Sequence, residues 1–170
     1  MALFGFGYVI TATFLGTIVR GSVEARALES VVWIVVGVSA VPSVAGWTWV
    51  GRRLGHSVAW TLACLLEAAG VVVSVLSHTV PGILLAATLL GGTFMGLTAL
   101  GLIQARQSAS GDPRRTLAVL TAAFGLGQIV GPTFAGVLHD MTGSFVVPSL
   151  TAGAALATAA WLMAAPRSTP

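Results

Sequence analysis

Long uncharged runs are the feature that most constrains this chain. The longest, from Ala68 to Ala105, contains no Asp, Glu, Lys or Arg. An apolar run of about 20 residues can cross the hydrocarbon core of a bilayer as a helix, whereas the strands of a membrane barrel alternate apolar and polar residues. The composition agrees, with 56% hydrophobic and 8% charged residues, against about 25% charged in soluble domains. The sequence therefore predicts an all-α membrane protein.

Charged clusters and turn-forming residues divide the chain into six predicted transmembrane helices. The turn-forming sequence at residues 77–82 splits the longest run into two, and Arg-containing segments separate most of the others. The predicted spans cover residues 1–19, 30–51, 57–76, 83–105, 116–138 and 146–165. They form a single six-helix membrane domain over residues 1–170, and an even number of crossings places both termini on the same side.

Basic residues predict the orientation of these spans. All eight are Arg, and they lie at the edges of the apolar runs, which indicates membrane topology and no nucleic-acid partner. The side that holds both termini collects six of them, Arg52, Arg53, Arg106, Arg114, Arg115 and Arg167, against Arg20 and Arg26 on the other. Both termini are therefore expected in the cytoplasm. The lack of Lys and Asn is typical of GC-rich genes, so we expect a multi-pass protein of a bacterial plasma (inner) membrane.

A ten-residue pattern occurs twice and predicts an internal repeat. Residues 37–46 and 127–136 both read G-x4-P-[ST]-x-A-G, at an offset of three spans. An odd number of spans reverses the direction through the membrane, so the pattern predicts a 3+3 inverted repeat, which is typical of secondary transporters. Proline breaks helical hydrogen bonding, and glycine lets helices approach closely. The predicted packing and kink residues are Pro42, Gly46, Gly92, Gly96, Gly127, Gly131 and Pro132.

Three stretches, residues 5–15, 91–97 and 120–132, resemble the carboxy-terminal half of the YbfB/YjiJ-like branch of the major facilitator superfamily. The resemblance implies that the six spans correspond to helices seven to twelve of a twelve-helix transporter. Residues 51–55 resemble the cytoplasmic gate loop of that superfamily, with Arg52, Arg53 and Gly55 as candidates, although Arg52 stands where the loop usually has an acidic residue. The missing amino-terminal half is expected to come from another six-helix unit or from self-association.

Polar and aromatic residues give candidates for the substrate cavity. The resemblance assigns the first, second, fourth and fifth spans to the cavity wall, and hydroxyl, amide and aromatic groups there would suit a small organic solute. The candidates are Tyr8, Thr11, Thr93, Gln104, Phe124 and Gln128. The same groups would equally serve as interhelical hydrogen-bonding residues that only hold the bundle together.

Glu67 is the only formal charge deep inside a span. Acidic residues within the membrane are costly unless they are neutral or paired, and they are often functional, so Glu67 is the proton-coupling candidate. The alternative is a neutral, hydrogen-bonded packing residue. The resemblance places this span at the periphery of the bundle.

Histidines and acidic residues form no catalytic or metal-binding pattern. The three His residues lie at span ends without a His-x3-His spacing, an acidic cluster or a phosphate loop beside them. We therefore predict no enzyme activity, no metal and no cofactor. The sequence favours half of a secondary active transporter that moves a small organic solute by alternating access with proton coupling. The alternative is a non-transporting membrane fragment or scaffold, the product of a split or decayed transporter gene.

Overall fold

The fold is a bundle of six α-helices joined by short connections. The computed structural model describes residues 1–170 except 22–25, 78, 110 and 166–170, and these described residues contain no strand. The prediction of an all-α protein with six long helices is confirmed. The elements are α1 (Ala2–Gly21), the short 3-10 helix η1 (Arg26–Leu28), α2 (Glu29–Leu54), α3 (His56–Leu76), α4 (Val80–Gln107), α5 (Pro113–Thr142) and α6 (Val146–Ala164).

Several helices extend beyond the apolar runs because polar residues cap them. Helix α4 begins at Val80, where the Thr79 hydroxyl accepts a hydrogen bond from the Gly82 backbone N–H at 3.4 Å. The Asp112 carboxylate accepts from the Arg114 N–H at 2.9 Å and caps α5. The polar connection predicted at residues 106–115 is therefore shorter, since residues 106–107 still belong to α4 and 113–115 already belong to α5.

Two glycines with positive φ end helices where the chain reverses direction. Gly143 follows α5 with a φ of 66°, the left-handed conformation that commonly closes a helix, and its N–H donates to the His139 carbonyl at 2.7 Å. Gly55 joins α2 to α3 with a φ of 93° and a ψ of 142°, a region open mainly to glycine. The connection predicted between the spans 116–138 and 146–165 therefore begins later, because α5 continues to Thr142.

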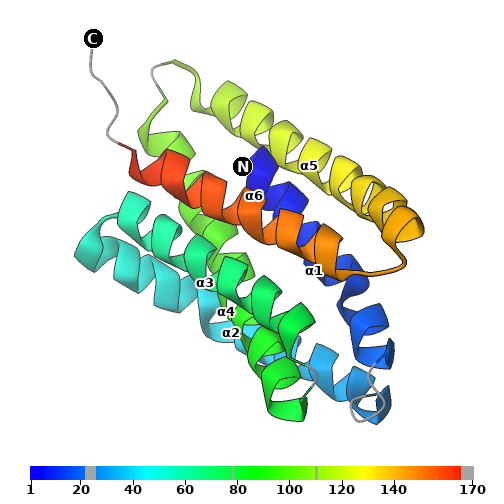
Figure 1. Ribbon diagram of the computed structural model, residues 1–170. Coiled ribbons are helices and arrows are strands. Elements are labelled where there is room, and N and C mark those ends of the chain that lie inside the picture. Colours follow the sequence, from blue (N-terminus) through cyan, green and yellow to red (C-terminus); the bar gives the residue numbers. More distant parts are fainter. Residues whose placement is uncertain (22–25, 78, 110, 166–170) are drawn as a thin grey trace.

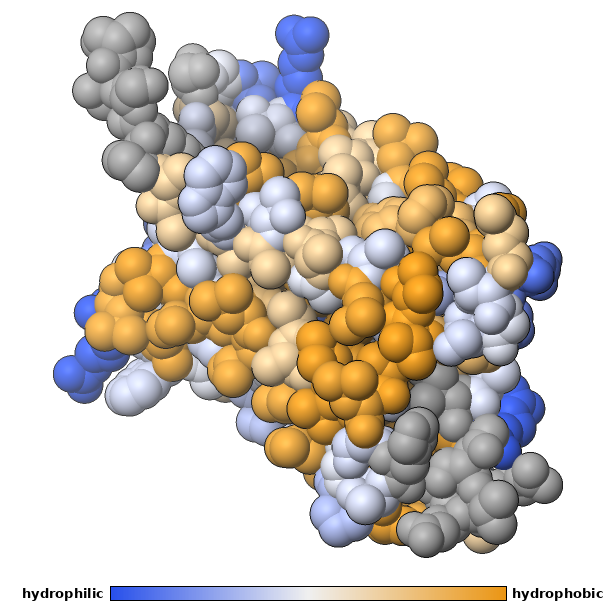
Figure 2. Space-filling model, viewed as in Figure 1, coloured by the Kyte–Doolittle hydropathy of each residue, from blue (hydrophilic) through white to orange (hydrophobic). Residues whose placement is uncertain are grey.

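Length and hydropathy make the bundle a membrane domain. Helices α2 to α6 are each long and apolar enough to span a bilayer, and α1, with 20 residues, is about 30 Å long. In Figure 2 apolar residues cover the middle of the visible face, and hydrophilic residues lie toward its two ends. This distribution is the one that a multi-pass membrane protein requires.

Successive helices run in opposite directions across the bundle. The start of α1, the Gly55 connection, the connection from α4 to α5 and the end of α6 lie at one end, which we call the Gly55 end (Figure 1). The starts of α2, α4 and α6 lie at the other end. Of the Arg residues predicted at the Gly55 end, Arg167 lies outside the described residues. With six helices that alternate in direction, the start of α1 and the end of α6 lie at the same end of the bundle.

The packing of the helices follows the predicted inverted repeat. Helix α1 packs mainly on α5 and α6, and α4 packs mainly on α2 and α3. If α1, α2 and α3 are matched with α4, α5 and α6, the contacts of α1 with α5 and α6 correspond to the contacts of α4 with α2 and α3. The contact between α3 and α6 maps onto itself, so the unit consists of two inversely oriented triplets.

The repeated sequence pattern packs differently in the two triplets. A Cβ atom at Gly127 would lie 2.8 Å from the Phe6 backbone nitrogen, and one at Gly131 would lie 2.8 Å from the Phe6 carbonyl oxygen, so both glycines bring α5 against α1. No described atom lies within 4 Å of the corresponding position at Gly37 or Gly46. Gly46, predicted as a packing residue, makes no close helix contact within the unit, because this part of α2 is exposed.

The predicted pair on α4 also divides. A Cβ at Gly96 would overlap the Trp47 ring, whereas no described atom lies within 4 Å of the Cβ position at Gly92. Gly92 was predicted as a packing residue, but no other helix of the unit lies close to its Cβ position. Its carbonyl accepts hydrogen bonds from α2. Of the two prolines, Pro42 is exposed and Pro132 is half-buried, and both lie inside continuous helices.

Candidate functional site

Aromatic rings from four helices meet inside the bundle. The rings of Tyr8 on α1 and Phe94 on α4 stack with centroids 3.9 Å apart, and Phe4 stacks on Phe124 of α5 at 5.4 Å. Phe4 also contacts Trp60 of α3 edge to face at 6.2 Å. Two cavity candidates, Tyr8 and Phe124, are thus brought into one cluster. Their rings mainly pack against other rings, which leaves Tyr8 and Phe124 half-buried.

Glu67 lies in the interior of the unit, on the face of α3 that meets α4. Its side chain is fully buried, and its Oε2 atom forms a hydrogen bond with the Thr93 hydroxyl at 3.2 Å. Its other oxygen, Oε1, is buried without a hydrogen-bond partner among the described residues. The contact joins the proton-coupling candidate to one of the cavity candidates.

The Thr93 hydroxyl lies within hydrogen-bond distance of Glu67 and of a backbone carbonyl. Thr93 Oγ1 lies 2.7 Å from the Leu89 carbonyl oxygen and 3.2 Å from Glu67 Oε2, and its single proton can serve only one of them. When that proton is donated to the closer carbonyl, the contact with Glu67 is a hydrogen bond only if the carboxyl carries its own proton. Among the described residues, Arg20 and Glu29 form an ion pair at 3.7 Å, at the opposite end from Gly55. An ionised carboxylate buried without a charged partner is costly, which makes the surroundings of Glu67 unusual.

The remaining cavity candidates do not gather around one space. Thr11 is buried and donates to the Gly7 carbonyl of its own helix at 3.4 Å. The Gln104 side-chain nitrogen donates to the Ser57 hydroxyl near the Gly55 end. Gln128 is half-buried on α5, and no hydrogen bond of its side chain is found among the described residues. The six candidates therefore divide between the aromatic cluster, the Glu67 contact and separate positions.

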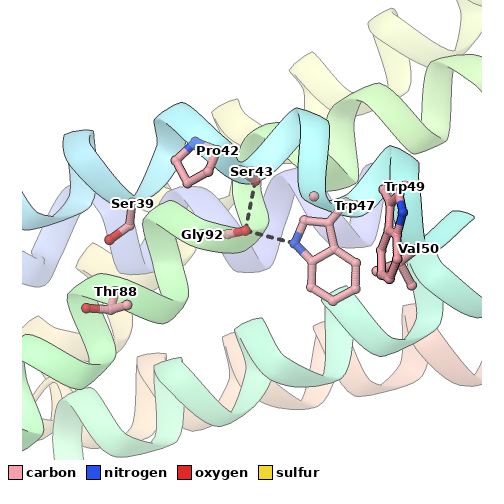
Figure 3. Close-up of a pocket in the computed structure, with 9 residues that line it drawn as sticks. Ser39, Pro42, Ser43, Trp47, Trp49, Val50, Thr88 and Gly92 are labelled. Carbon is pink, nitrogen blue, oxygen red and sulfur yellow. Dashed lines mark hydrogen bonds between the residues drawn. The ribbon is translucent and has the colours of Figure 1, made fainter.

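An open groove of about 550 Å³ lies between α2 and α4, as Figure 3 shows. The Ser43 hydroxyl and the Trp47 indole N–H both donate to the Gly92 carbonyl, each at 2.8 Å. Ser43 Oγ also accepts from the Gly96 N–H at 2.9 Å, so this network fixes α2 on α4. We call this space the α2–α4 groove. Its lining residues are Ser39, Pro42, Ser43, Gly46, Trp47, Trp49, Val50, Thr88 and Gly92.

The α2–α4 groove lies at mid-height in the bundle. Pro42 is the fourteenth of the 26 residues of α2, and Gly92 is the thirteenth of the 28 residues of α4. Substrates of transporters built from inverted repeats bind near the midplane of the bilayer. The sequence analysis placed Pro42, Gly46 and Gly92 only as packing residues and missed Ser39, Trp47 and Thr88. The clustering of hydroxyl groups, small residues and Trp around Pro42 was the available signal.

The candidate gate loop is a tight connection between α2 and α3. Gly55 has its positive φ here, and its N–H donates to the Gly51 carbonyl at 3.0 Å. Arg52 and Arg53 are exposed in the last turn of α2, and the Arg53 guanidinium lies over the Trp49 ring, 5.5 Å from its centroid. No carboxylate of the described residues forms an ion pair with either Arg. A cation–π contact with Trp49 therefore holds the Arg53 side chain in this loop.

The comparisons with known proteins decide the family. A family model described as "Uncharacterised MFS-type transporter YbfB" matches residues 1–164. This chain belongs to the YbfB-like family of major facilitator transporters. The match covers all six helices, so the membrane-spanning bundle is a transporter domain. No curated protein and no solved structure matched this YbfB-like chain.

Proposed function

We propose that this YbfB-like six-helix unit forms one half of a secondary active transporter, which moves a small organic solute by alternating access coupled to protons. The α2–α4 groove supplies the half-site for the solute, and Glu67 carries the coupled proton. The observation that supports the solute site most directly is the groove at mid-height, with two indole rings and several hydroxyl groups on its wall. Such a lining suits an amphipathic solute without a strong charge. We further propose that the unit lies in a bacterial plasma membrane with the Gly55 end in the cytoplasm.

The exposure of two related helices supports a half-transporter. Among the five helices that qualify as complete spans, α2 and α5 bury the smallest share of their residues within the unit. They occupy equivalent positions in the two inverted triplets, and the α2–α4 groove opens beside α2. A second six-helix unit packed against both helices would enclose the groove. Helices α2 and α5 of the two units would then border one central cavity, as in transporters made of two related halves.

Filling the groove should stop transport without harming the fold. Gly46→Leu places a side chain into the groove from a position where no described atom lies within 4 Å of the new Cβ. Uptake would be measured in proteoliposomes with a panel of radiolabelled neutral amphipathic solutes. We expect at least one saturable uptake activity in the wild type, and a loss of about tenfold or more in the variant, which corresponds to about 1.4 kcal/mol.

Gly37→Leu is the matched control for the groove. Gly37 is also exposed on α2 with open space around its Cβ, but it does not line the groove. We expect the control variant to transport like the wild type. Equal transport by all three proteins would show that the groove is not the solute site, and an absence of saturable uptake in the wild type would favour a non-transporting scaffold.

Transport activity should require association of six-helix units. The α2–α4 groove is open on one side, and polar groups exposed to lipid are unfavourable, so a partner unit should cover this face. Chemical crosslinking of the reconstituted protein should give a dimer, and dilution in lipid should reduce dimer and uptake together. A protein that stays monomeric at all lipid ratios and still shows saturable uptake would contradict the half-transporter proposal.

A further inference from the structure

Glu67 needs a route by which its proton enters and leaves, and the structure offers one at the Gly55 end. Besides the Thr93 hydroxyl of α4, the ionisable groups near Glu67 are Tyr8 of α1 and Cys64 of α3, and the Met1 amino group lies near Cys64. Helix α6, which also packs on α3, contains no ionisable residue. None of these groups relays a proton to bulk water by itself. The buried and unpartnered Oε1 atom of Glu67 is therefore the atom whose access has to be explained.

A pocket of about 260 Å³ opens among the start of α1, the beginning of α3 and the end of α6. We call it the end pocket. It lies at the Gly55 end of the bundle, where these three elements come together (Figure 1). Its lining residues are Met1, Ala2, Leu3, Trp60, Ala159, Leu162 and Met163.

Trp60 lines the end pocket. The ring is buried, and its N–H donates to the Leu97 carbonyl of α4 at 3.1 Å. Phe4 packs against it edge to face, so the ring is held by a hydrogen bond on one side and by an aromatic contact on the other. Trp60 and Glu67 are seven residues, or about two helical turns, apart on α3, a distance of about 10 Å.

Small residues fill α3 between the indole and the carboxyl. Residues seven apart lie on the same face of a helix, and the intervening positions on this face are Ala63 and Cys64, both fully buried. No large side chain of α3 itself therefore stands between Trp60 and Glu67. Leu97 of α4 and Leu156 of α6 belong to the same buried cluster, so water can reach Glu67 from the end pocket only if the Trp60 ring and this packing open together. Water then carries protons between groups too far apart for a direct hydrogen bond.

We propose that the end pocket is the entry through which protons exchange between Glu67 and the Gly55 side of the membrane, and that Trp60 is the barrier in this route. The inference rests on the proposed role of Glu67 and adds the path and its side of the membrane. Trp60 is a positioning residue that acts through access, since it does not touch the carboxyl. Breaking its hydrogen bond with Leu97 opens the route, and re-forming that bond closes it.

Infrared spectroscopy of the reconstituted full chain in deuterated buffer tests this route. The band of the protonated Glu67 carboxyl is identified as the one lost in Glu67→Gln, and the rate at which it shifts on exchange reports access from water. Ala2→Trp fills the mouth of the end pocket from an exposed position, and we expect exchange to slow about tenfold, or about 1.4 kcal/mol in the barrier. Trp60→Phe removes the N–H that holds the barrier, and we expect exchange to become about tenfold faster.

Two matched controls separate access from general loosening. Ala118→Trp adds the same ring at an exposed position of α5 that does not line the end pocket, and Trp161→Phe makes the same change at an exposed position of α6. Both controls should exchange like the wild type. Unchanged exchange in Ala2→Trp overturns the proposal, and so does unchanged exchange in folded Trp60→Phe. If Trp60→Phe loses its helical circular dichroism signal, Ala2→Trp decides alone.

The spectroscopic readout keeps this inference separate from the proposed transport. A wild-type protein without the Glu67 band overturns both the route and the coupling role of Glu67, while the Gly46→Leu experiment still tests solute transport. A wild-type protein with the band and with exchange insensitive to Ala2→Trp leaves the coupling role standing and removes only the route. Loss of solute uptake with normal exchange would affect the transporter proposal alone.

Discussion

Glu67→Gln should abolish accumulation of solute driven by a pH gradient while leaving solute exchange without a gradient intact. Gln has nearly the shape of a protonated carboxyl and can keep the contact with Thr93, but it cannot release a proton. A gradient of one pH unit coupled to one proton supplies about 1.4 kcal/mol, enough for about tenfold accumulation. We expect this accumulation to disappear in proteoliposomes loaded with a solute that the wild type takes up.

Glu29→Gln is the control for the loss of a carboxylate. Glu29 begins α2, and its side chain pairs with Arg20 at 3.7 Å, so it lies far from Thr93 and from the groove. We expect this variant to accumulate solute like the wild type. Accumulation by Glu67→Gln at the wild-type level would show that Glu67 is a neutral packing residue, which is the alternative role considered from the sequence. A parallel loss of exchange and of folded protein would also assign Glu67 a structural role.

Glu67 illustrates how far sequence reasoning reaches in a membrane bundle. An acidic residue in the middle of an apolar run is conspicuous without any structure, because its cost in lipid is large. The identity of its partner could not be predicted, since Thr93 meets Glu67 only for one rotation and one register of α4 against α3. Sequence periodicity gives the face of a helix but not the face opposite.

The α2–α4 groove was missed for a related reason. The repeated pattern predicted Pro42 and Gly46 only as kink and packing residues and gave no sign of an open space beside them. In the structure Ser43 is buried against α4, whereas the matching Thr133 is exposed and donates to the Ile129 carbonyl of its own helix. Helices α2 and α5 therefore turn matching positions of the repeat toward different surroundings, although their sequences are similar there. Sequence similarity therefore predicted the inverted repeat but not which copy would border an open space.

Gly127→Leu should disrupt the contact between α1 and α5 and greatly reduce the amount of folded protein. A Cβ at this position would lie 2.8 Å from the Phe6 backbone nitrogen and closer still to the Ala2 carbonyl oxygen. Backbone atoms of a packed helix cannot turn aside as a flexible side chain can, so α1 has to move as a whole. Forcing extra atoms into a packed interface costs about 1–3 kcal/mol and sometimes more. We expect a lower unfolding temperature in detergent and a several-fold loss of monodisperse protein in size-exclusion chromatography.

Gly125→Leu makes the same change two residues earlier with the opposite expectation. No described atom lies within 4 Å of a Cβ at Gly125, because this position faces away from α1. Replacing Gly by Leu in an open helical position removes the conformational entropy cost of Gly, which is worth about 0.5–1 kcal/mol. Gly125→Leu should therefore unfold at the wild-type temperature or above it. If both variants behave alike, the close approach of α1 to α5 is not what selects glycine at position 127.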